Sequence, residues 1–182
     1  HLYNMKIIIK DNFLLKPTTV YNSCKKIPLY STKEFNSKFK TDESWAGVRS
    51  APLFDIKPSV AKEIVINMGK YFKELFETVD TPLKIFVHKR DKKFKKKDWI
   101  HHDDNNDCLY VGLLYLSKTN LKSGTMFYDK KKNPITDVKF VQNRMIFFDS
   151  KYLHSAYGHH DDRLNITVTI YKGKSNDTEK TI

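Results

Sequence analysis

Hydrophobic positions recur with two different periods along the chain, the first typical of helices and the second of strands. After Pro58, hydrophobic residues recur every three to four positions, which is the period of an amphipathic helix. Ser59 is the expected N-cap of this helix, and the pattern continues to Val79 before Thr81-Pro82 interrupts it. Its aromatic-rich face indicates core packing. A shorter helix is expected over residues 32–40.

The second half of the chain reads as short strands separated by turns. Strands are expected at 83–88, 99–103, 109–116, 125–128, 138–141, 144–148 and 164–171, with one or two further short strands within 6–16. Ser-Gly, Asn-Pro and Asp/Asn clusters lie between them, as is usual in turns. Strands at this density favour a double-sheet jelly roll over an alternating α/β sheet.

The predicted fold class is therefore mainly β with N-terminal helices, an α+β arrangement around a double-stranded β-helix (jelly roll, cupin-like) core. A length of 182 residues fits one domain over 1–182. Helical support is expected at about 17–82, the jelly-roll core at about 83–172 and a flexible tail at 173–182. The hydrophobic content of 40% is sufficient for a packed core.

Two observations bear on location. No apolar run approaches the roughly 20 residues that a membrane-spanning helix needs, so the chain is expected not to cross a membrane. Cys24 and Cys108 are the two cysteines, and no secretory signal pattern is evident. This combination favours a reduced, intracellular and cytoplasmic protein, in the host cytoplasm if the source is viral.

A candidate metal site lies within the expected strands. His101-His102-Asp103-Asp104 contains two His-x-Asp pairs, and residues two apart on a strand point to the same face. A third ligand from a distant strand, His154, would complete a two-histidine, one-carboxylate set for non-haem Fe(II). A second string, His159-His160-Asp161-Asp162, has no later histidine and reads as a polar turn. The residues alone leave both registers open, His101 with Asp103 or His102 with Asp104.

The strand that follows His154 carries a candidate anion clamp. Arg163 lies nine residues after His154 and opens an alternating strand. Its apolar face comprises Leu164, Ile166, Val168 and Ile170, and its polar face comprises Arg163, Asn165, Thr167 and Thr169. A guanidinium on a polar face beside a metal ligand is suited to hold a carboxylate by two parallel hydrogen bonds.

Five segments, in this order, carry a family resemblance. They are Trp99-Ile100-His101-His102-Asp103, Gly112-Leu113-Leu114-Tyr115-Leu116-Ser117, Ser123-Gly124-Thr125-Met126-Phe127-Tyr128, Phe147-Phe148-Asp149-Ser150 with His154, and Arg163 with Ile166-Thr167-Val168; a fainter match is Trp45-Ala46-Gly47-Val48-Arg49-Ser50. With them the chain resembles the Fe(II)- and 2-oxoglutarate-dependent dioxygenases, in particular small phage and bacterial members of the prolyl 4-hydroxylase-like branch. An aromatic and a β-branched residue precede the first ligand in that family, which favours the register of His101 and Asp103.

The resemblance implies an enzyme that hydroxylates a C–H bond, with a peptidyl proline favoured, while 2-oxoglutarate is decarboxylated to succinate. Fe(II) would be held by the catalytic residues His101, Asp103 and His154. The far carboxylate of 2-oxoglutarate would meet Arg163, helped by Tyr115 and Thr167. The reaction consumes O2, and ascorbate supports it in such enzymes. One departure is that residues 83–90 offer no clear match to a tyrosine that many prolyl hydroxylases carry there.

A basic run precedes the candidate metal site. The chain carries 33 Lys and Arg against 21 Asp and Glu, a net charge of +12, and residues 89–97 hold seven bases and one acid. Such a run can bind nucleic acid, but a solvated loop and the codon usage of an AT-rich genome explain it as well. Because the run ends shortly before His101, we expect it to border the mouth of the active site and to attract an acidic or extended peptide. The lysines of this possible entrance loop are Lys92, Lys93, Lys95, Lys96 and Lys97.

Two alternatives compete with a hydroxylase of peptides or proteins. A dioxygenase of the alkylation-repair type would act on nucleic acid, but that branch has a second arginine six residues after the clamp, where this chain has Thr169. A non-catalytic, basic, cupin-like binding protein would need neither an open metal site nor a carboxylate clamp. An acidic or proline-containing peptide is therefore the favoured partner, nucleic acid is disfavoured, and no membrane partner is expected.

Overall fold

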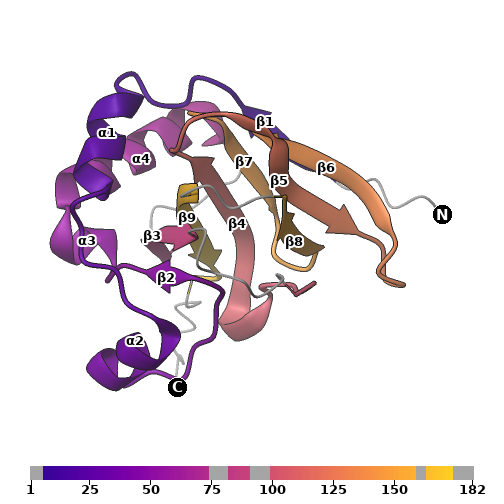
Figure 1. The fold of residues 1–182 in the computed structure, drawn as a ribbon, viewed down its shortest axis with the longest axis horizontal. Helices are drawn as coiled ribbons and strands as arrows, with labels where there is room; N and C mark the ends of the chain where they lie inside the picture. The colour runs from indigo at the N-terminus through magenta and orange to yellow at the C-terminus, as the bar shows by residue number, and fades with distance from the viewer. Residues whose placement is uncertain (1–5, 74–81, 91–98, 159–162, 174–182) are drawn as a thin grey trace, which may run out of the picture.

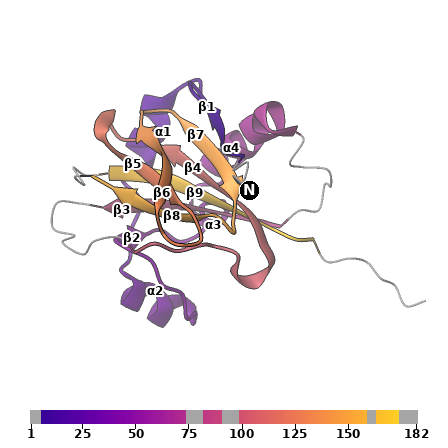
Figure 2. The ribbon, with the colours of Figure 1, turned by 90° about the vertical axis from the view of Figure 1, so that its right-hand side faces the viewer.

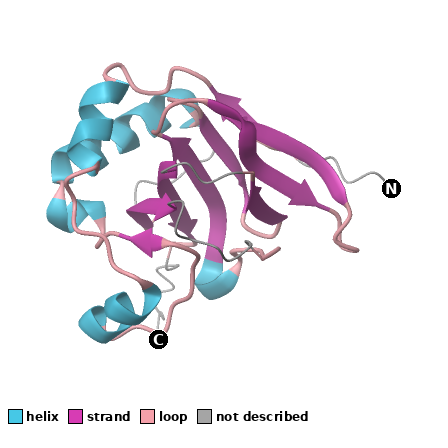
Figure 3. Cartoon of the chain, viewed as in Figure 1, coloured by secondary structure: helices cyan, strands magenta, loops and turns pink. Residues whose placement is uncertain are grey.

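The fold consists of two antiparallel β-sheets and a layer of helices (Figures 1 and 3). The computed structural model describes residues 6–73, 82–90, 99–158 and 163–173. The larger sheet has the order β1-β7-β4-β9-β3-β2, with β1 at Ile8–Lys10, β7 at Met145–Asp149, β4 at Cys108–Tyr115, β9 at Arg163–Tyr171, β3 at Leu83–Arg90 and β2 at Val48–Arg49. The smaller sheet has the order β6-β5-β8, with β6 at Pro134–Phe140, β5 at Asn120–Tyr128 and β8 at Leu153–Tyr157.

Three of the helices cover one face of the larger sheet (Figure 1, left). The helices are α1 at Pro17–Cys24, α2 at Thr32–Phe39, α3 at Leu53–Ile56 and α4 at Pro58–Tyr71. In α4, Val60, Ile64 and Met68 recur at helical spacing and are buried together with residues of β3, β4, β7 and β9. The predicted amphipathic helix is thus confirmed, and its apolar face forms the main core with α1 and α3.

The short helix α2 lies apart from the other three and is stabilised at its start by a capping box. The Ser31 hydroxyl accepts a hydrogen bond from the Glu34 amide, and the Glu34 carboxylate accepts one from the Ser31 amide. The helix ends at Phe39, where Lys40 adopts the left-handed conformation. The prediction of a helix over 32–40 is confirmed.

The smaller sheet packs against the other face of the larger one (Figure 2). Phe127 of β5 and Phe140 of β6 enter a second core cluster with Tyr115 of β4 and Phe148 of β7. Phe127 and Phe148 meet edge to face at 4.9 Å between ring centroids, and Tyr115 stacks on Phe140 at 4.3 Å. The described chain is therefore mainly β with helices in its N-terminal part, as the predicted fold class requires.

Two expectations about single elements are wrong. Lys57, and not Ser59, precedes α4, because Pro58 occupies its first turn, where a missing N–H and a fixed φ cost nothing. Residues 99–103 do not form a strand but make an isolated bridge between His101 and His154. The expected extension of α4 to Val79 falls largely on residues 74–81. Residues 91–97 of the basic run and residues 174–182 of the predicted tail also lie outside the described residues.

Within the described residues, none of the helices has the length and apolar character needed to cross a membrane. Cys24 and Cys108 are both buried free thiols.

Candidate active site

A cavity of about 600 Å³ lies between the two sheets and is floored by the larger one. Alternate residues of β9 line it, namely Arg163, Asn165, Thr167, Thr169 and Tyr171. The intervening residues Leu164, Ile166, Val168 and Ile170 are buried in the main core on the opposite face of the sheet. The predicted apolar and polar faces of this strand are therefore confirmed, and the polar face looks into the cavity.

Strand β3 adds a second row of cavity-lining side chains in register with β9. Arg90 pairs with Arg163, His88 with Asn165, Phe86 with Thr167 and Lys84 with Thr169, and all eight residues line the cavity. The cavity floor is thus most basic where β3 ends and β9 begins.

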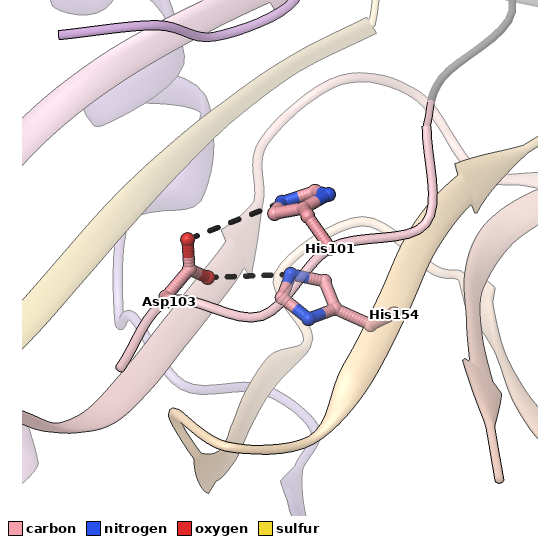
Figure 4. A group of neighbouring side chains, drawn as sticks. All are labelled: His101, Asp103 and His154. Carbon is pink, nitrogen blue, oxygen red and sulfur yellow. Dashed lines mark ion pairs between the residues drawn. The ribbon is translucent and has the colours of Figure 1, made fainter. Parts of the chain in front are cut away.

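His101, Asp103 and His154 converge at one place on the cavity wall (Figure 4). Their potential ligand atoms all lie within 4.8 Å of one another. Asp103 Oδ2 lies 3.3 Å from His154 Nε2, and Asp103 Oδ1 lies 4.0 Å from His101 Nε2. One carboxylate therefore sits between two imidazoles, which is the donor set of a two-histidine, one-carboxylate centre.

The backbone holds the three residues together. His101 and His154 exchange two main-chain hydrogen bonds, of 3.1 and 2.8 Å, and the Asp103 amide donates to the Ser150 carbonyl at 2.7 Å. His154 lies on β8, while His101 and Asp103 lie on the segment that leads into β4. The segment is thus attached to the edge of the smaller sheet beside β8.

Both imidazole rings are oriented by hydrogen bonds from Nδ1. His101 Nδ1 lies 2.9 Å from the Trp99 carbonyl oxygen, and His154 Nδ1 lies 2.9 Å from the Tyr152 carbonyl oxygen. A carbonyl oxygen can only accept, so Nδ1 carries the hydrogen in each ring and Nε2 faces Asp103. Fixing a ligand imidazole by its other nitrogen is the usual outer-shell arrangement of metal sites.

The other register brings no third ligand together. His102 and Asp104 contact each other through Nδ1 and Oδ1, and the His102 side chain is 49% exposed. Among the described residues, the only group of three or more potential ligands is the one formed by His101, Asp103 and His154. The geometry thus favours the register of His101 and Asp103.

Arg163 lies elsewhere on the cavity wall, where β9 meets β5. It is 5% exposed, and its Nη1 donates to the Gly124 carbonyl at 2.8 Å. The guanidinium lies 4.9 Å from the Phe140 ring centroid and 5.3 Å from that of Tyr115, within cation–π range. These contacts hold the arginine fork in place against a mostly apolar backing.

Tyr115 and Thr167, the two expected helpers of Arg163, are placed differently. Thr167 lines the cavity, whereas Tyr115 is fully buried and does not line it. The Tyr115 hydroxyl lies 2.8 Å from Thr125 Oγ1, and Thr125 does line the cavity beside Arg163. Burial raises the pKa of Tyr115, so this hydroxyl keeps its proton. Thr125 was not predicted as a site residue, although it lies in the segment 123–128 that carries part of the family resemblance.

The N-terminal part of the chain forms a third wall of the cavity, and its residues were not predicted as site residues from the sequence. The Arg49 guanidinium lies 3.7 Å from the Trp45 ring centroid and 4.2 Å from that of Phe86, and it pairs with the Glu43 carboxylate. Arg49, Trp45 and Glu43 all line the cavity. Burial, with Arg49 and Arg90 nearby, holds the pKa of His88 well below its usual range, so His88 is neutral beside these cations.

The five lysines of the possible entrance loop, Lys92, Lys93, Lys95, Lys96 and Lys97, lie outside the described residues. Their role remains a prediction.

Among known proteins, the chain is similar to solved structures but not to family models or curated sequences. No protein-family model and no curated protein sequence matches the chain. Many solved structures do, among them a prolyl-4-hydroxylase of Pseudomonas putida (TM-score 0.57, 12% identity, 94% of this chain and 95% of that one). A prolyl hydroxylase of Trichoplax adhaerens in complex with a hypoxia inducible factor peptide fragment gives a TM-score of 0.68 at 14% identity, over 93% and 85% of the two chains.

HygX from Streptomyces hygroscopicus, solved with nickel and 2-oxoglutarate bound, gives a TM-score of 0.63 at 11% identity. The match covers 92% of this chain and 83% of HygX. Similarity of this kind establishes the fold, which is a double-stranded β-helix like that of these proteins.

Proposed function

We propose that the protein is an Fe(II)- and 2-oxoglutarate-dependent oxygenase that hydroxylates a C–H bond. The observation that carries this proposal is that one cavity contains both a His-Asp-His donor set and a buried arginine fork. A pure binding protein needs neither, and the fold is the one in which prolyl hydroxylases and other 2-oxoglutarate oxygenases are built.

The separation of the two features fits a five-carbon 2-oxo diacid. His154 and Ala156 lie two residues apart on β8, and both line the cavity. Ala156 pairs with Thr125, whose hydroxyl lies 3.5 Å from Arg163 Nη2. Two residues of a strand advance about 7 Å, which is about the length of such a molecule, so a 2-oxo diacid could lie along β8 between the donor set and the fork.

The residues of the chain have distinct roles in this proposal. His101, Asp103 and His154 would hold Fe(II) through two Nε2 atoms and one carboxylate, and Arg163, with Thr167 and Thr125, would hold the far carboxylate of 2-oxoglutarate. Tyr115 would act through Thr125 and not by direct contact. When bound, Fe(II) supplies the redox chemistry that couples O2 and the decarboxylation of 2-oxoglutarate to hydroxylation of the substrate. Phe127 and Phe148 pack against the His154 ring and keep water from that side of it.

For the substrate we propose a peptide, with a prolyl residue as the favoured target. One solved structure with this fold is a prolyl hydroxylase in complex with a peptide fragment. The cavity wall carries aromatic side chains, Trp45, Phe86, Trp99 and Tyr171, of the kind that bind proline-containing segments. The basic run at 89–97 would favour an acidic peptide at the entrance.

The test is succinate formation from 2-oxoglutarate by the Fe(II)-loaded protein with O2 and ascorbate, together with metal affinity measured by calorimetry with Mn(II). We expect turnover in the wild type, stimulated by a member of a peptide array that gains the mass of one oxygen. Asp103→Ala and His101→Ala should abolish turnover and weaken Mn(II) binding by about tenfold or more, because each removes a ligand.

His102→Ala is the matched control and should keep both properties within about threefold, because His102 lies beside Asp104 and outside the donor set. Loss of metal binding in His102→Ala but not in His101→Ala would show that the other register is used. If the wild-type protein shows neither turnover nor metal-dependent binding of 2-oxoglutarate, the proposed oxygenase activity is refuted. If alkylated nucleic acid, and not peptide, stimulates succinate formation, the substrate is a nucleic acid, as for dioxygenases of the alkylation-repair type.

A further inference from the structure

His88 lines the cavity, and its capacity for hydrogen bonds is unused. It lies on β3 and is half-buried. Within the described residues neither of its ring nitrogens has a hydrogen-bond partner, and both are accessible. The imidazoles of the donor set differ, since His101 and His154 are each fixed through Nδ1. A ring nitrogen that is accessible and without a partner inside a cavity is available to a ligand.

The surroundings of His88 favour an uncharged ligand group. Burial first, and then the charges of Arg49 on β2 and Arg90 on β3, lower the pKa of this ring, so it is neutral. A neutral imidazole has one N–H donor and one acceptor nitrogen. A peptide group has the same complement, one N–H and one C=O, whereas a carboxylate only accepts and an ammonium only donates. His88 therefore matches a main-chain amide better than it matches an ion.

His88 lies one strand beyond the groups assigned to the cosubstrate. The larger sheet contains the order β4-β9-β3, so β9 separates β3 from β4, while Thr125 and His154 belong to the smaller sheet. Phe86, and not His88, lies opposite Thr167. A cavity of about 600 Å³ is of the size that holds a drug-sized ligand, so a five-carbon diacid leaves part of it open. The part of the floor formed by β3 is therefore available to the substrate.

Trp45 forms the wall next to His88. Their ring centroids lie 6.4 Å apart, with an angle of 46° between the ring planes, and both residues line the cavity. Phe35 meets the Trp45 ring edge to face at 5.0 Å, and the Arg49 guanidinium lies over the same ring. The indole is thus backed by protein and offers the cavity an aromatic surface beside an imidazole. Aromatic surfaces bind proline-containing segments in several peptide-recognition modules.

Helix α2 holds this wall in place from outside the cavity. The Asn36 carboxamide donates to the Glu43 carbonyl at 2.8 Å and accepts from the Glu43 amide at 3.1 Å. The Thr32 hydroxyl donates to the Trp45 carbonyl at 3.2 Å. Three main-chain groups of the segment that carries Glu43 and Trp45 are therefore attached to α2. A wall that is fixed before binding reduces the entropic cost of taking up a ligand.

We propose that His88 and Trp45 form the subsite for the substrate residue that is hydroxylated. His88 hydrogen-bonds the peptide group that follows this residue, and Trp45 packs against its pyrrolidine ring. This assignment rests on the proposed function and names the part of the cavity that takes the peptide. It also gives α2 a role, which is to position the substrate wall and not the metal or the cosubstrate.

The test compares peptide hydroxylation with cosubstrate binding. An array of peptides Ac-Ala-Xaa-Pro-Yaa-Ala-NH2 is incubated with the Fe(II)-loaded protein, 2-oxoglutarate, O2 and ascorbate, and the peptide that gains most oxygen with the wild type is used for kinetics. We expect His88→Phe to lower kcat/KM for this peptide by about tenfold, because the hydrogen bonds to the peptide group are lost. The dissociation constant of 2-oxoglutarate from the Mn(II)-loaded protein, measured by calorimetry, should stay within about twofold.

Two further variants separate hydrogen bonding from shape and from folding. His88→Gln keeps a donor and an acceptor, so its loss in kcat/KM should be at most about threefold. If His88→Phe does not fold, Asn36→Ala replaces it and should raise KM for the peptide several-fold, because it releases the segment of Trp45 without touching the cavity.

Lys84→Gln is the matched control on β3. Lys84 also lines the cavity but lies four residues from His88, opposite Thr169, so kcat/KM should stay within about twofold of the wild type.

An unchanged kcat/KM in His88→Phe would overturn the assignment, and so would equal losses in His88→Phe and His88→Gln. Weakened 2-oxoglutarate binding in His88→Phe would also overturn it, because His88 would then serve the cosubstrate or the fold. A wild type that turns over 2-oxoglutarate but hydroxylates no peptide of the array would instead refute the prolyl peptide as substrate, and a wild type without turnover would refute the oxygenase itself.

Discussion

Two histidines that line the same cavity are held by different neighbours. The ring of His154 donates from Nδ1 to a backbone carbonyl and turns Nε2 toward Asp103. The ring of His88 lies among arginines, where burial first, and then the charges of Arg49 and Arg90, keep its pKa well below the usual range. The Tyr152 carbonyl therefore orients one ring toward Asp103, while burial, together with the two arginines, keeps the other ring neutral.

The depressed pKa of His88 predicts a pH-dependent stability. The unfolded chain binds a proton at His88 below about pH 6.5 and the folded chain does not, so the free energy of unfolding falls as the pH decreases below 6.5, by up to about 1.4 kcal/mol per pH unit. Above that pH this contribution is constant. Urea unfolding of the metal-free protein between pH 5 and 7 should show a shallower decrease for His88→Gln than for the wild type. Parallel curves would show that His88 is protonated in the folded protein.

The sequence indicated single side chains where their types and order match a known motif. His101, Asp103, His154 and Arg163 were singled out because their types and order are characteristic of one reaction class. The contact of Tyr115 with Thr125 and the pairing of His88 with Asn165 were not predicted, because they depend on the register between strands. No local pattern contains that register.

Among the elements, hydrophobic periodicity was sufficient where one face enters a core. It predicted α4 and β9, each of which has a clean apolar face. It missed β8, because Leu153–Tyr157 places His154 on the cavity face and so lacks an apolar alternation. It also gave a false strand at 99–103, where one bridge to His154 replaces a ladder.

Strand β5 offers a prediction about the arginine anchor. A Cβ on Gly124 would overlap the Val138 carbonyl oxygen, and the Gly124 carbonyl accepts the hydrogen bond from Arg163 Nη1. Gly124→Ala should therefore lower the free energy of unfolding by about 1–3 kcal/mol and also weaken 2-oxoglutarate binding. Chemical denaturation and calorimetry measure the two effects.

Gly69→Ala is the control for this substitution. Nothing lies within 4 Å of a Cβ at position 69 in α4, so alanine should be neutral or stabilise the protein by up to about 1 kcal/mol, without an effect on binding. A Gly124→Ala variant as stable as Gly69→Ala, with unchanged affinity, would contradict the role given to the Gly124 backbone.

For the molecule as a whole, ligands should act as cross-links between distant segments. The donor set brings β8 together with the segment before β4, and Arg163 of β9 is hydrogen-bonded to Gly124 of β5. We expect Mn(II) with 2-oxoglutarate to raise the midpoint of thermal unfolding, since ligand at 100 times its dissociation constant adds about 2.7 kcal/mol. EDTA should reverse the shift, and Asp103→Ala should show none. A shift of the same size in Asp103→Ala would place the metal elsewhere.

The bridge between His101 and His154 also has a consequence for biogenesis. Its two halves are separated in the chain by β4, β5, β6 and β7, so a nascent chain that has emerged only as far as β7 carries His101 and Asp103 without their partner. Contacts of such long sequence separation have a high entropic cost of loop closure and slow the folding of a chain. If the proposed function is correct, the complete donor set for iron would therefore form only after β8 has emerged, and a chain that ends at β7 would lack the third ligand. The rate at which refolding protein acquires metal affinity would then report the last step of folding.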